Sequence, residues 1–192
     1  MTSDILLVRH TEVVRSWKHR CYGRSDIALS RAGHRHAQEL AARLAKEPVT
    51  AIFHSGLARA AVLAGQLAKL KRLEPIVDAR WRERDFGEWE GRTWNEIWRE
   101  TGNAMDGMLS SPRHYRPGGG ETTAELSART IAAWRALPRE GLLVVVTHGG
   151  PIAALRAMHA GAPLGDMALY RVAEGAVARV SRPHGGNDPT SS

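Results

Sequence analysis

Two histidines each follow directly on a short apolar run, and this position makes them candidates for chemistry. His10 follows a run that begins at Ile5, and His148 follows a run that begins at Leu142. Imidazole is both a nucleophile and a proton carrier near neutral pH, and the end of a strand is a rigid mount for a reactive group. A histidine in this position can also be a core residue that is hydrogen-bonded to the backbone. The residues around each histidine therefore have to be considered before a reactive role is assigned.

Arg9 stands directly before His10. An imidazole nitrogen can attack a phosphoryl group and form a phosphohistidine, provided that the negative charge of the phosphoryl oxygens is neutralised. The planar guanidinium of an adjacent arginine presents paired donors that match those oxygens. The Arg9-His10 pair therefore indicates phosphoryl chemistry.

Two turns that contain glycine offer further contacts to an anion. Ser55 and Gly56 lead from an apolar run into a helical pattern that carries Arg59, and His148 leads through Gly149 into another helical pattern. The free amides and the dipole of a helix N-terminus attract negative charge. The alternatives are an ordinary capped helix with a surface arginine and a core histidine that is satisfied by a neighbour.

A carboxylate for proton transfer is predicted in residues 81–91, which are dense in acids, aromatics and glycines. If the backbone is extended there, Glu83 projects from the face opposite Arg82 and Arg84. A carboxyl that faces a bound phosphate dianion tends to hold its proton, which a general acid requires. A solvated charged loop is the alternative interpretation.

The elements that must position these residues are predicted from the hydrophobic pattern. The segments of strand type are 5–8, 51–54, 142–147 and, as a hairpin, 168–173 with 176–180. Helical spacing appears over 37–44, with Ser30 as a candidate N-cap, over 57–68 and over 126–137. This order predicts a three-layer α/β/α sandwich with a mainly parallel central sheet, in which ligands bind beyond the carboxyl ends of the strands.

Residues 92–121 interrupt the alternation of strands and helices. We expect a short helix around 93–101 and then a loop-rich insertion that forms a small lid over the site; a surface excursion without a role is the alternative. The length suits one domain over residues 1–182, followed by a small, polar tail at 183–192 that is predicted to be disordered.

Composition narrows the classes of function. The formal charge of +7 arises from 27 basic and 20 acidic residues. It fits either a basic cleft for phosphorylated substrates or nucleic acid, or the arginine-rich composition of proteins from a GC-rich genome. The basic residues form no run of five, so the charge alone does not predict nucleic-acid binding.

A single cysteine, Cys21, excludes an intramolecular disulfide. Only four apolar residues are consecutive near the N-terminus, which is too few for the core of a signal peptide or for a membrane span. We expect a cytoplasmic protein with neither a membrane nor a nucleic-acid partner.

Five motifs resemble those of the histidine phosphatase superfamily, which includes the cofactor-dependent phosphoglycerate mutases, in order and spacing over residues 5 to about 160. The motifs are Arg9-His10-Thr11, Ser55-x-Leu57-x-Arg59-Ala60, Glu83 with Phe86-Gly87-Glu88-Trp89-Glu90-Gly91, Gly119-Gly120-Glu121-Thr122 and Thr147-His148-Gly149-Gly150. Three positions depart from the common pattern. Thr11 replaces a more frequent glycine, Gly56 stands where proline is common, and His54 stands in place of a small or aromatic residue. These departures put specificity in question more than activity.

The resemblance implies a phosphohistidine mechanism without a metal or an organic cofactor. His10 matches the nucleophile and Glu83 matches the proton donor to the leaving group, which would later act as base for the attacking water. His148 matches a third catalytic group that holds the phosphate. The expected substrate and phosphate contacts are Arg9, Thr11, Arg24, Arg59 and Gly149.

The resemblance predicts a phosphomonoesterase for a small phosphorylated metabolite. Residues 21–26 are similar to the branch often labelled α-ribazole phosphatase, so α-ribazole phosphate is a candidate substrate. Two alternatives are carried: phosphotransfer of the phosphoglycerate mutase type, and a non-catalytic module that binds phosphoryl groups or nucleic acid. The short lid and the polar tail favour hydrolysis over mutase chemistry. A homodimer is expected at the level of the family only.

Overall fold

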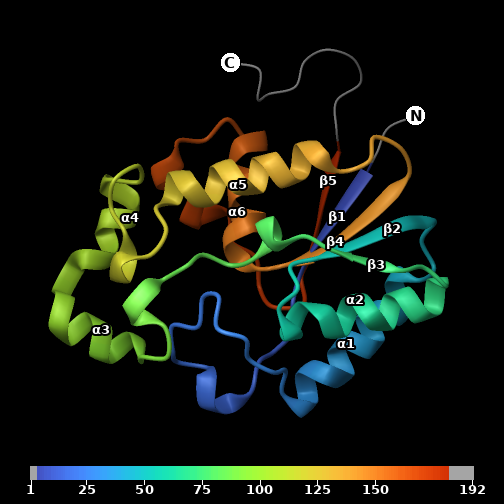
Figure 1. Cartoon of the computed structure of the whole chain (residues 1–192), viewed down its shortest axis with the longest axis horizontal. Coiled ribbons are helices and arrows are strands. Elements are labelled where there is room, and N and C mark those ends of the chain that lie inside the picture. Colours follow the sequence, from blue (N-terminus) through green and yellow to red (C-terminus); the bar gives the residue numbers. More distant parts are fainter. Residues whose placement is uncertain (1–3, 182–192) are drawn as a thin grey trace.

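A five-stranded sheet forms the centre of the computed structural model, which describes residues 4–181 (Figure 1). Its strands, in the order β3-β2-β4-β1-β5 across the sheet, are β1 (Asp4–Arg9), β2 (Val49–His54), β3 (Pro75–Val77), β4 (Leu142–Thr147) and β5 (Val177–Ser181). The first four strands pair in parallel, and β5 pairs antiparallel with β1. The predicted mainly parallel sheet is confirmed.

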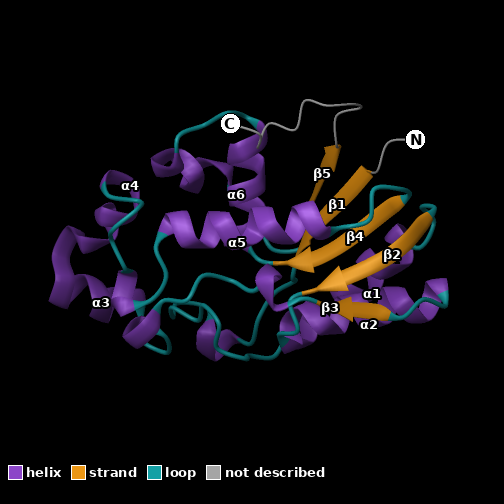
Figure 2. Cartoon of the chain, turned by 45° about the horizontal axis from the view of Figure 1, so that its top comes forward, coloured by secondary structure: helices purple, strands orange, loops and turns teal. Residues whose placement is uncertain are grey.

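Helices cover both faces of this sheet (Figure 2). They are α1 (Arg31–Leu44), α2 (Ala58–Lys71), α3 (Trp94–Thr101), α4 (Gly107–Ser110), α5 (Thr123–Ala136) and α6 (Gly149–His159). On one face Leu6 and Val8 pack with buried residues of α1 and α2, and on the other Ile5 and Leu7 pack with buried residues of α5 and α6. The fold is therefore the predicted three-layer α/β/α sandwich.

Burial explains why the strands were readable in the sequence. All six residues of β4 are buried because this strand lies between β2 and β1 and is covered on both faces, and a strand of that kind is a continuous apolar run. The predicted cap of α1 is confirmed, since the Ser30 hydroxyl accepts a hydrogen bond from the Gly33 amide at 2.9 Å.

The predicted hairpin of 168–173 with 176–180 is wrong in its first half. Residues Leu164–Tyr170 form a 3₁₀ helix, and β5 pairs with β1 instead. The apolar residues of this helix suggested a strand, but Leu169 is 81% exposed and Met167 packs against α6. The short edge strand β3 was not predicted, because it has three residues and begins with proline.

The interruption at 92–121 contains α3 at the predicted place, followed by α4 and short 3₁₀ turns. Figure 2 shows α3 and α4 on the side toward which β2 and β4 point. This is the side of the carboxyl ends of the parallel strands, where ligands bind in such folds. Within 4–181 no helix is long and apolar enough to cross a membrane, and no group of three or more histidine, cysteine or acidic residues could hold a metal ion. The predicted tail at 183–192 lies outside the described residues.

Candidate active site

His10 and His148 lie side by side because of strand register. β1 and β4 run parallel with Arg9 opposite Thr147, so the residues that follow both strands are neighbours. The centroids of the two imidazole rings are 5.2 Å apart. Two segments that are distant in the sequence thus bring their histidines side by side in the interior of the protein.

The His10 ring is held with one nitrogen free. Nδ1 lies 2.8 Å from the Thr11 carbonyl oxygen, which can only accept, so Nδ1 carries the proton and donates it. Nε2 is buried and has no hydrogen-bond partner among the described residues. A neutral imidazole in this tautomer has its lone pair on Nε2, which is the form that a nucleophile requires.

The tautomer of His148 is fixed by two partners. Arg59 Nε donates to His148 Nδ1 at 3.3 Å, and His148 Nε2 lies 2.8 Å from Ser55 Oγ. Because Nδ1 accepts, Nε2 carries the proton of the neutral ring. In this tautomer His148 Nε2 donates a hydrogen bond to Ser55 Oγ.

Two arginines flank the histidines. Arg59 lies in the first turn of α2, is fully buried, and donates to the carbonyl oxygens of Gly23 at 2.6 Å and Ser25 at 2.7 Å. Arg9 donates to the Val172 carbonyl oxygen at 2.7 Å, and its guanidinium is 4.0 Å from a Glu174 carboxylate oxygen. Both guanidiniums are close enough to His10 to lower its pKa. Their predicted contact with a phosphoryl group stays a prediction.

Burial and positive charge keep both histidines neutral. Burial lowers the pKa of His10 to about 3, and Arg59 contributes in the same direction. The pKa of His148 is lowered well below its ordinary value, again mainly by burial and then by Arg59. At neutral pH the His10 imidazole is therefore unprotonated without the help of a separate base.

These lowered pKa values predict that acid destabilises the protein. Between pH 6.5 and about 3 the unfolded chain binds a proton at His10 and the folded chain does not, so the free energy of unfolding falls as the pH falls. His10 alone accounts for a loss of about 2 kcal/mol at pH 5 relative to pH 8. Urea unfolding at the two pH values measures this loss. A His10→Asn variant should show a smaller loss, and equal losses in both proteins would contradict the assignment.

Glu83 enters the same region from the segment after Trp81. Its carboxylate accepts hydrogen bonds from the amide of Arg84 at 2.8 Å and from the amide of Gly150 at 3.0 Å. Burial opposes ionisation, but Arg171 and these two amides hold the pKa of Glu83 below its usual value. In the ligand-free site Glu83 is thus a carboxylate, and the predicted retention of its proton depends on a bound phosphate dianion.

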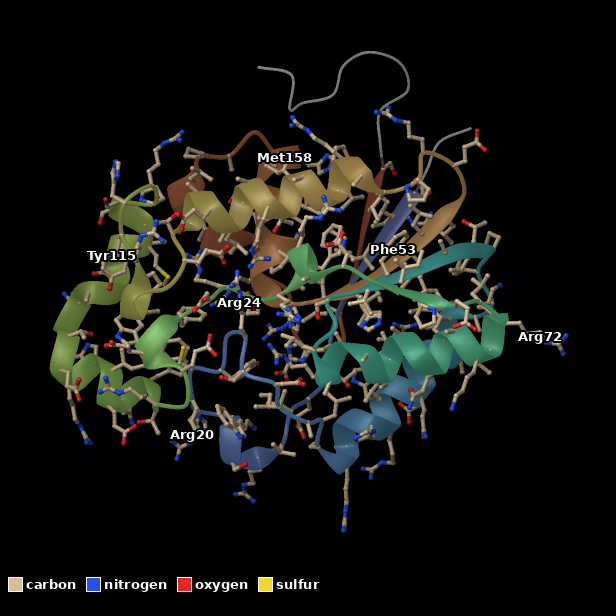
Figure 3. The ribbon with its side chains drawn as sticks, in the orientation of Figure 1. Arg20, Arg24, Phe53, Arg72, Tyr115 and Met158 are labelled. Carbon is tan, nitrogen blue, oxygen red and sulfur yellow. The ribbon has the colours of Figure 1, made fainter. Side chains whose placement is uncertain are left out.

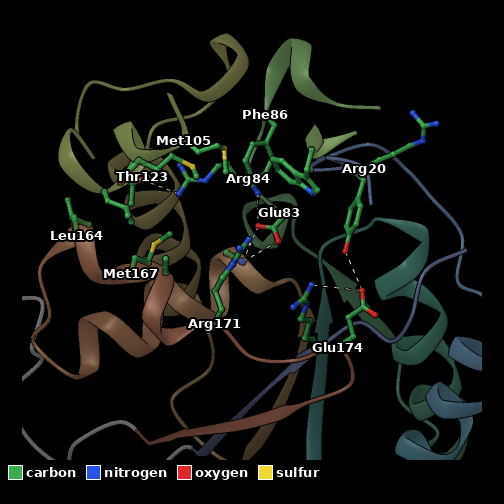
Figure 4. A pocket seen from close by; sticks show the side chains of 18 of the residues that line it. Arg20, Glu83, Arg84, Phe86, Met105, Thr123, Leu164, Met167, Arg171 and Glu174 are labelled. Carbon is green, nitrogen blue, oxygen red and sulfur yellow. Dashed lines mark hydrogen bonds and ion pairs between the residues drawn. The ribbon is translucent and has the colours of Figure 1, made fainter. Parts of the chain in front are cut away.

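A cavity of about 530 Å³ opens beside these residues (Figure 4). Glu83 lines it, whereas His10, Arg59 and His148 are almost fully buried and do not belong to its lining. Five cationic residues line it: Arg9, Lys18, Arg20, Arg84 and Arg171. Its apolar lining includes Phe86, Trp94, Met105, Met108, Leu164 and Met167. The α3–α4 insertion thus contributes to the cavity, and the lining suits an anion with an apolar part. That the insertion acts as a lid stays a prediction.

The remaining predicted contacts have structural partners. Thr11 is buried, and its hydroxyl donates to the Gly33 carbonyl oxygen at 2.8 Å. Gly149 is the first residue of α6, where an added Cβ would lie 3.5 Å from Arg9 Cζ. Arg24 pairs with Asp85 at 3.3 Å and with Glu121 at 3.4 Å, and it does not line the cavity. Their roles toward a substrate stay predictions.

Sequence analysis missed three residues around this cavity. Tyr22 lies beside Arg59, whose Cζ is 5.1 Å from the centre of the tyrosine ring, and Arg171 points toward Glu83 in Figure 4. Glu174 accepts a hydrogen bond from the Tyr22 hydroxyl at 3.4 Å. Tyr22 was visible only as part of the 21–26 motif. Arg171 and Glu174 fell in or beside a hairpin that does not form.

A neutral histidine with a free nitrogen, near arginines and at the carboxyl end of a parallel sheet, provides the groups that attack on a phosphoryl group requires. The chain belongs to the histidine phosphatase superfamily, since the model of branch 1 of this family matches residues 5–191. The resemblance stated from the motifs is confirmed.

Relatives of known name include both mutases and phosphatases. Phosphoglycerate mutase-like protein 4 of Arabidopsis thaliana is 33% identical over 80% of this chain and 69% of that protein. The probable phosphoglycerate mutase GpmB of Proteus mirabilis is 32% identical over 92% of this chain and 84% of its own. The metal-independent phosphoserine phosphatase of Arabidopsis thaliana is 31% identical over 80% and 67%.

Solved structures of similar proteins have the same fold. YhfR of Bacillus stearothermophilus superimposes with a TM-score of 0.86 at 28% identity, over 95% of this chain and 93% of its own. A mycobacterial glucosyl-3-phosphoglycerate phosphatase gives a TM-score of 0.83 at 27% identity, over 94% and 91%. The α-ribazole phosphatase of Shigella flexneri gives 0.80 at 24% identity, over 92% and 89%, and this match supports the fold alone.

Proposed function

We propose that the protein is a phosphomonoesterase that hydrolyses a small phosphorylated metabolite through a phosphohistidine on His10. The observation that carries the proposal is the unpartnered, buried Nε2 of a neutral His10, whose Nδ1 is fixed by the Thr11 carbonyl. The positive charge of Arg9 and Arg59 and the Nε2 proton of His148 supply what a phosphoryl group needs around this nucleophile.

In the first step Nε2 of His10 attacks phosphorus, and the bond between phosphorus and the ester oxygen breaks. Glu83 donates a proton to that oxygen, which leaves as an alcohol. Since Glu83 is ionised in the ligand-free site, the proton enters with the substrate, whose phosphate has a second pKa of about 6. The negative charge of the bound phosphate then favours the protonated form of Glu83.

In the second step water attacks phosphorus, and Glu83 accepts a proton from that water. The bond between phosphorus and Nε2 breaks, and its electron pair returns to the imidazole. Inorganic phosphate leaves, and Glu83 gives up the proton to the departing phosphate or to solvent, so that the neutral His10 and the ionised Glu83 of the ligand-free site are restored. The two steps need no metal, so activity should persist in EDTA.

Hydrolysis and phosphotransfer to a second substrate share the first step, and names of both kinds occur among the relatives. We expect release of inorganic phosphate from monoesters and no primer-dependent exchange between 2- and 3-phosphoglycerate, because the lid is short and water must reach the phosphoenzyme. The measurement compares phosphate release with isomerisation in the presence of 2,3-bisphosphoglycerate. Isomerisation that is faster than hydrolysis would favour the mutase alternative.

The substrate is best sought with a panel of phosphorylated metabolites. α-Ribazole phosphate belongs in that panel because of the 21–26 pattern, whereas the two solved structures named for α-ribazole phosphatases are 24% identical and support only the fold.

A non-catalytic module that binds phosphoryl groups or nucleic acid would be expected to lack His10, Glu83 or one of the arginines Arg9 and Arg59, and all of these are present. Salt-sensitive retention on nucleic acid without turnover of any monoester would favour the module. The cytoplasmic location and the homodimer stay predictions.

A further inference from the structure

The segment that carries Glu83 belongs to no strand or long helix. A 3₁₀ turn ends at Trp81 and the next begins at Gly87, and residues 82–86 between them are irregular. Glu83 is only 7% exposed, so the polar groups of this backbone lie largely out of water. Buried backbone groups outside regular structure need partners in side chains, in other backbone groups or in ordered water.

Arg129 on α5 is the side chain that satisfies them. Nη1 donates to the carbonyl oxygens of Arg80 and Arg82, each at 2.7 Å, and Nη2 donates to the carbonyl oxygen of Glu83 at 2.9 Å. One planar guanidinium thus contacts three carbonyls within four residues. This geometry fixes where the main chain of Glu83 lies relative to α5.

Glu121 holds the guanidinium in place. Its carboxylate accepts from Arg129 Nε at 2.6 Å and from Arg129 Nη2 at 2.8 Å, which is a bidentate pair. The two side chains are 9% and 17% exposed, so the pair is poorly screened by water. Arg24, which is labelled in Figure 3, also donates to this carboxylate, at 3.4 Å. The Glu121 carboxylate also accepts a hydrogen bond at 3.4 Å from the amide of Asp85, which follows Glu83 by two residues in the sequence.

The nucleophile does not depend on this pair. His10 is positioned by β1 and by the Thr11 carbonyl, and Arg9 and Arg59 have their own partners. A disturbance of the Glu121–Arg129 pair therefore displaces the proton donor while the attacking nitrogen keeps its place.

We propose that Glu121 and Arg129 are positioning residues for Glu83, and that they serve protonation of the leaving group and not the attack by His10. This inference rests on the proposed function, since Glu83 must be the proton donor for it to hold. The Gly-Gly-Glu-Thr motif thereby gains a physical role in this chain, because its glutamate anchors the arginine that holds the segment of the acid.

The test compares two substrates in the same preparation. 4-Nitrophenyl phosphate has a leaving group that needs little protonation, whereas β-glycerol phosphate releases an alcohol that needs it. For Arg129→Met and Glu121→Gln we expect the ratio of kcat/KM for the aryl ester to that for the alkyl ester to rise about tenfold or more, because small displacements of a catalytic group are costly. Arg129→Lys, which keeps the charge but not the planar fork, should raise the ratio less.

The control is Arg116→Met, which removes another ion pair at the same helix. Arg116 pairs with Glu125 in an exposed position and donates to the Gly120 carbonyl oxygen at 3.0 Å, and it has no hydrogen bond or ion pair with the described residues 80–85. Its ratio should equal that of the unmodified protein. The ratio does not depend on the fraction of folded enzyme, so partial unfolding of a variant leaves the test intact. Equal losses of kcat/KM on both esters in Arg129→Met, Glu121→Gln and Arg129→Lys would overturn the inference. Absence of turnover of both esters by the unmodified protein would instead overturn the proposed function, and this inference with it.

Discussion

Replacement of His10 by alanine is expected to lower phosphatase activity by about 10⁴-fold or more, because the proposed covalent route has no other nucleophile. His10 Nε2 is the buried nitrogen that has a free lone pair beside Arg9 and Arg59. Aryl and alkyl phosphates should lose activity alike, since both need the bond to phosphorus. Steady-state release of phosphate from each ester measures the loss.

The matched control for this prediction is His34→Ala, which removes an exposed histidine of α1 and should leave turnover unchanged. His10 is buried, so the fold of the His10 variant has to be verified by circular dichroism, and His10→Gln provides a second variant of closer size. A folded variant that retains more than about a tenth of the activity on either ester would show that another group attacks phosphorus.

Glu83→Gln is the second change with a large expected effect. Glutamine keeps the shape of the side chain and can still accept from the Gly150 amide, but it cannot deliver a proton. We expect kcat/KM for an alkyl phosphate to fall about 10² to 10³-fold, and kcat/KM for 4-nitrophenyl phosphate to fall less than about tenfold. The ratio of the two losses measures how much protonation of the leaving group by Glu83 contributes to hydrolysis of the alkyl ester.

An exposed acid of the same motif provides the control. Glu88→Gln changes the charge by the same amount without touching the cavity, and both esters should be hydrolysed as before. Equal losses on both esters in Glu83→Gln would assign Glu83 to binding or to the water step alone, and the proton donor would have to be sought elsewhere.

Much of the site could be predicted from the sequence because short, local patterns determine it. Two apolar runs predict parallel strands, and parallel strands in register bring their following residues together, which is how His10 and His148 meet. Ser30 and the helical spacing after it were readable for the same reason, since a cap and a helix involve residues only three or four positions apart.

What could not be predicted depends on partners that are distant in the sequence. The ionised state of Glu83 depends on Arg171, and the position of its backbone depends on Arg129. No local pattern in residues 81–91 reveals either arginine. The predicted strand at 168–173 overlaps the end of the 3₁₀ helix Leu164–Tyr170. The sequence pattern suggested a strand there, whereas the helix packs against α6 through Met167, a contact that the local pattern does not reveal.

The central claim, a covalent phosphoenzyme on His10, is tested most directly by rapid acid-free quenching of the protein with a ³²P-labelled monoester. Because Nδ1 is bonded to the Thr11 carbonyl and Nε2 is free, the label should be stable to alkali, labile to acid, attached to Nε2 of the histidine in the peptide that contains His10, and absent from His10→Gln. Label on another residue, or phosphate release at full rate with no labelled protein at any time of quenching, would contradict the account.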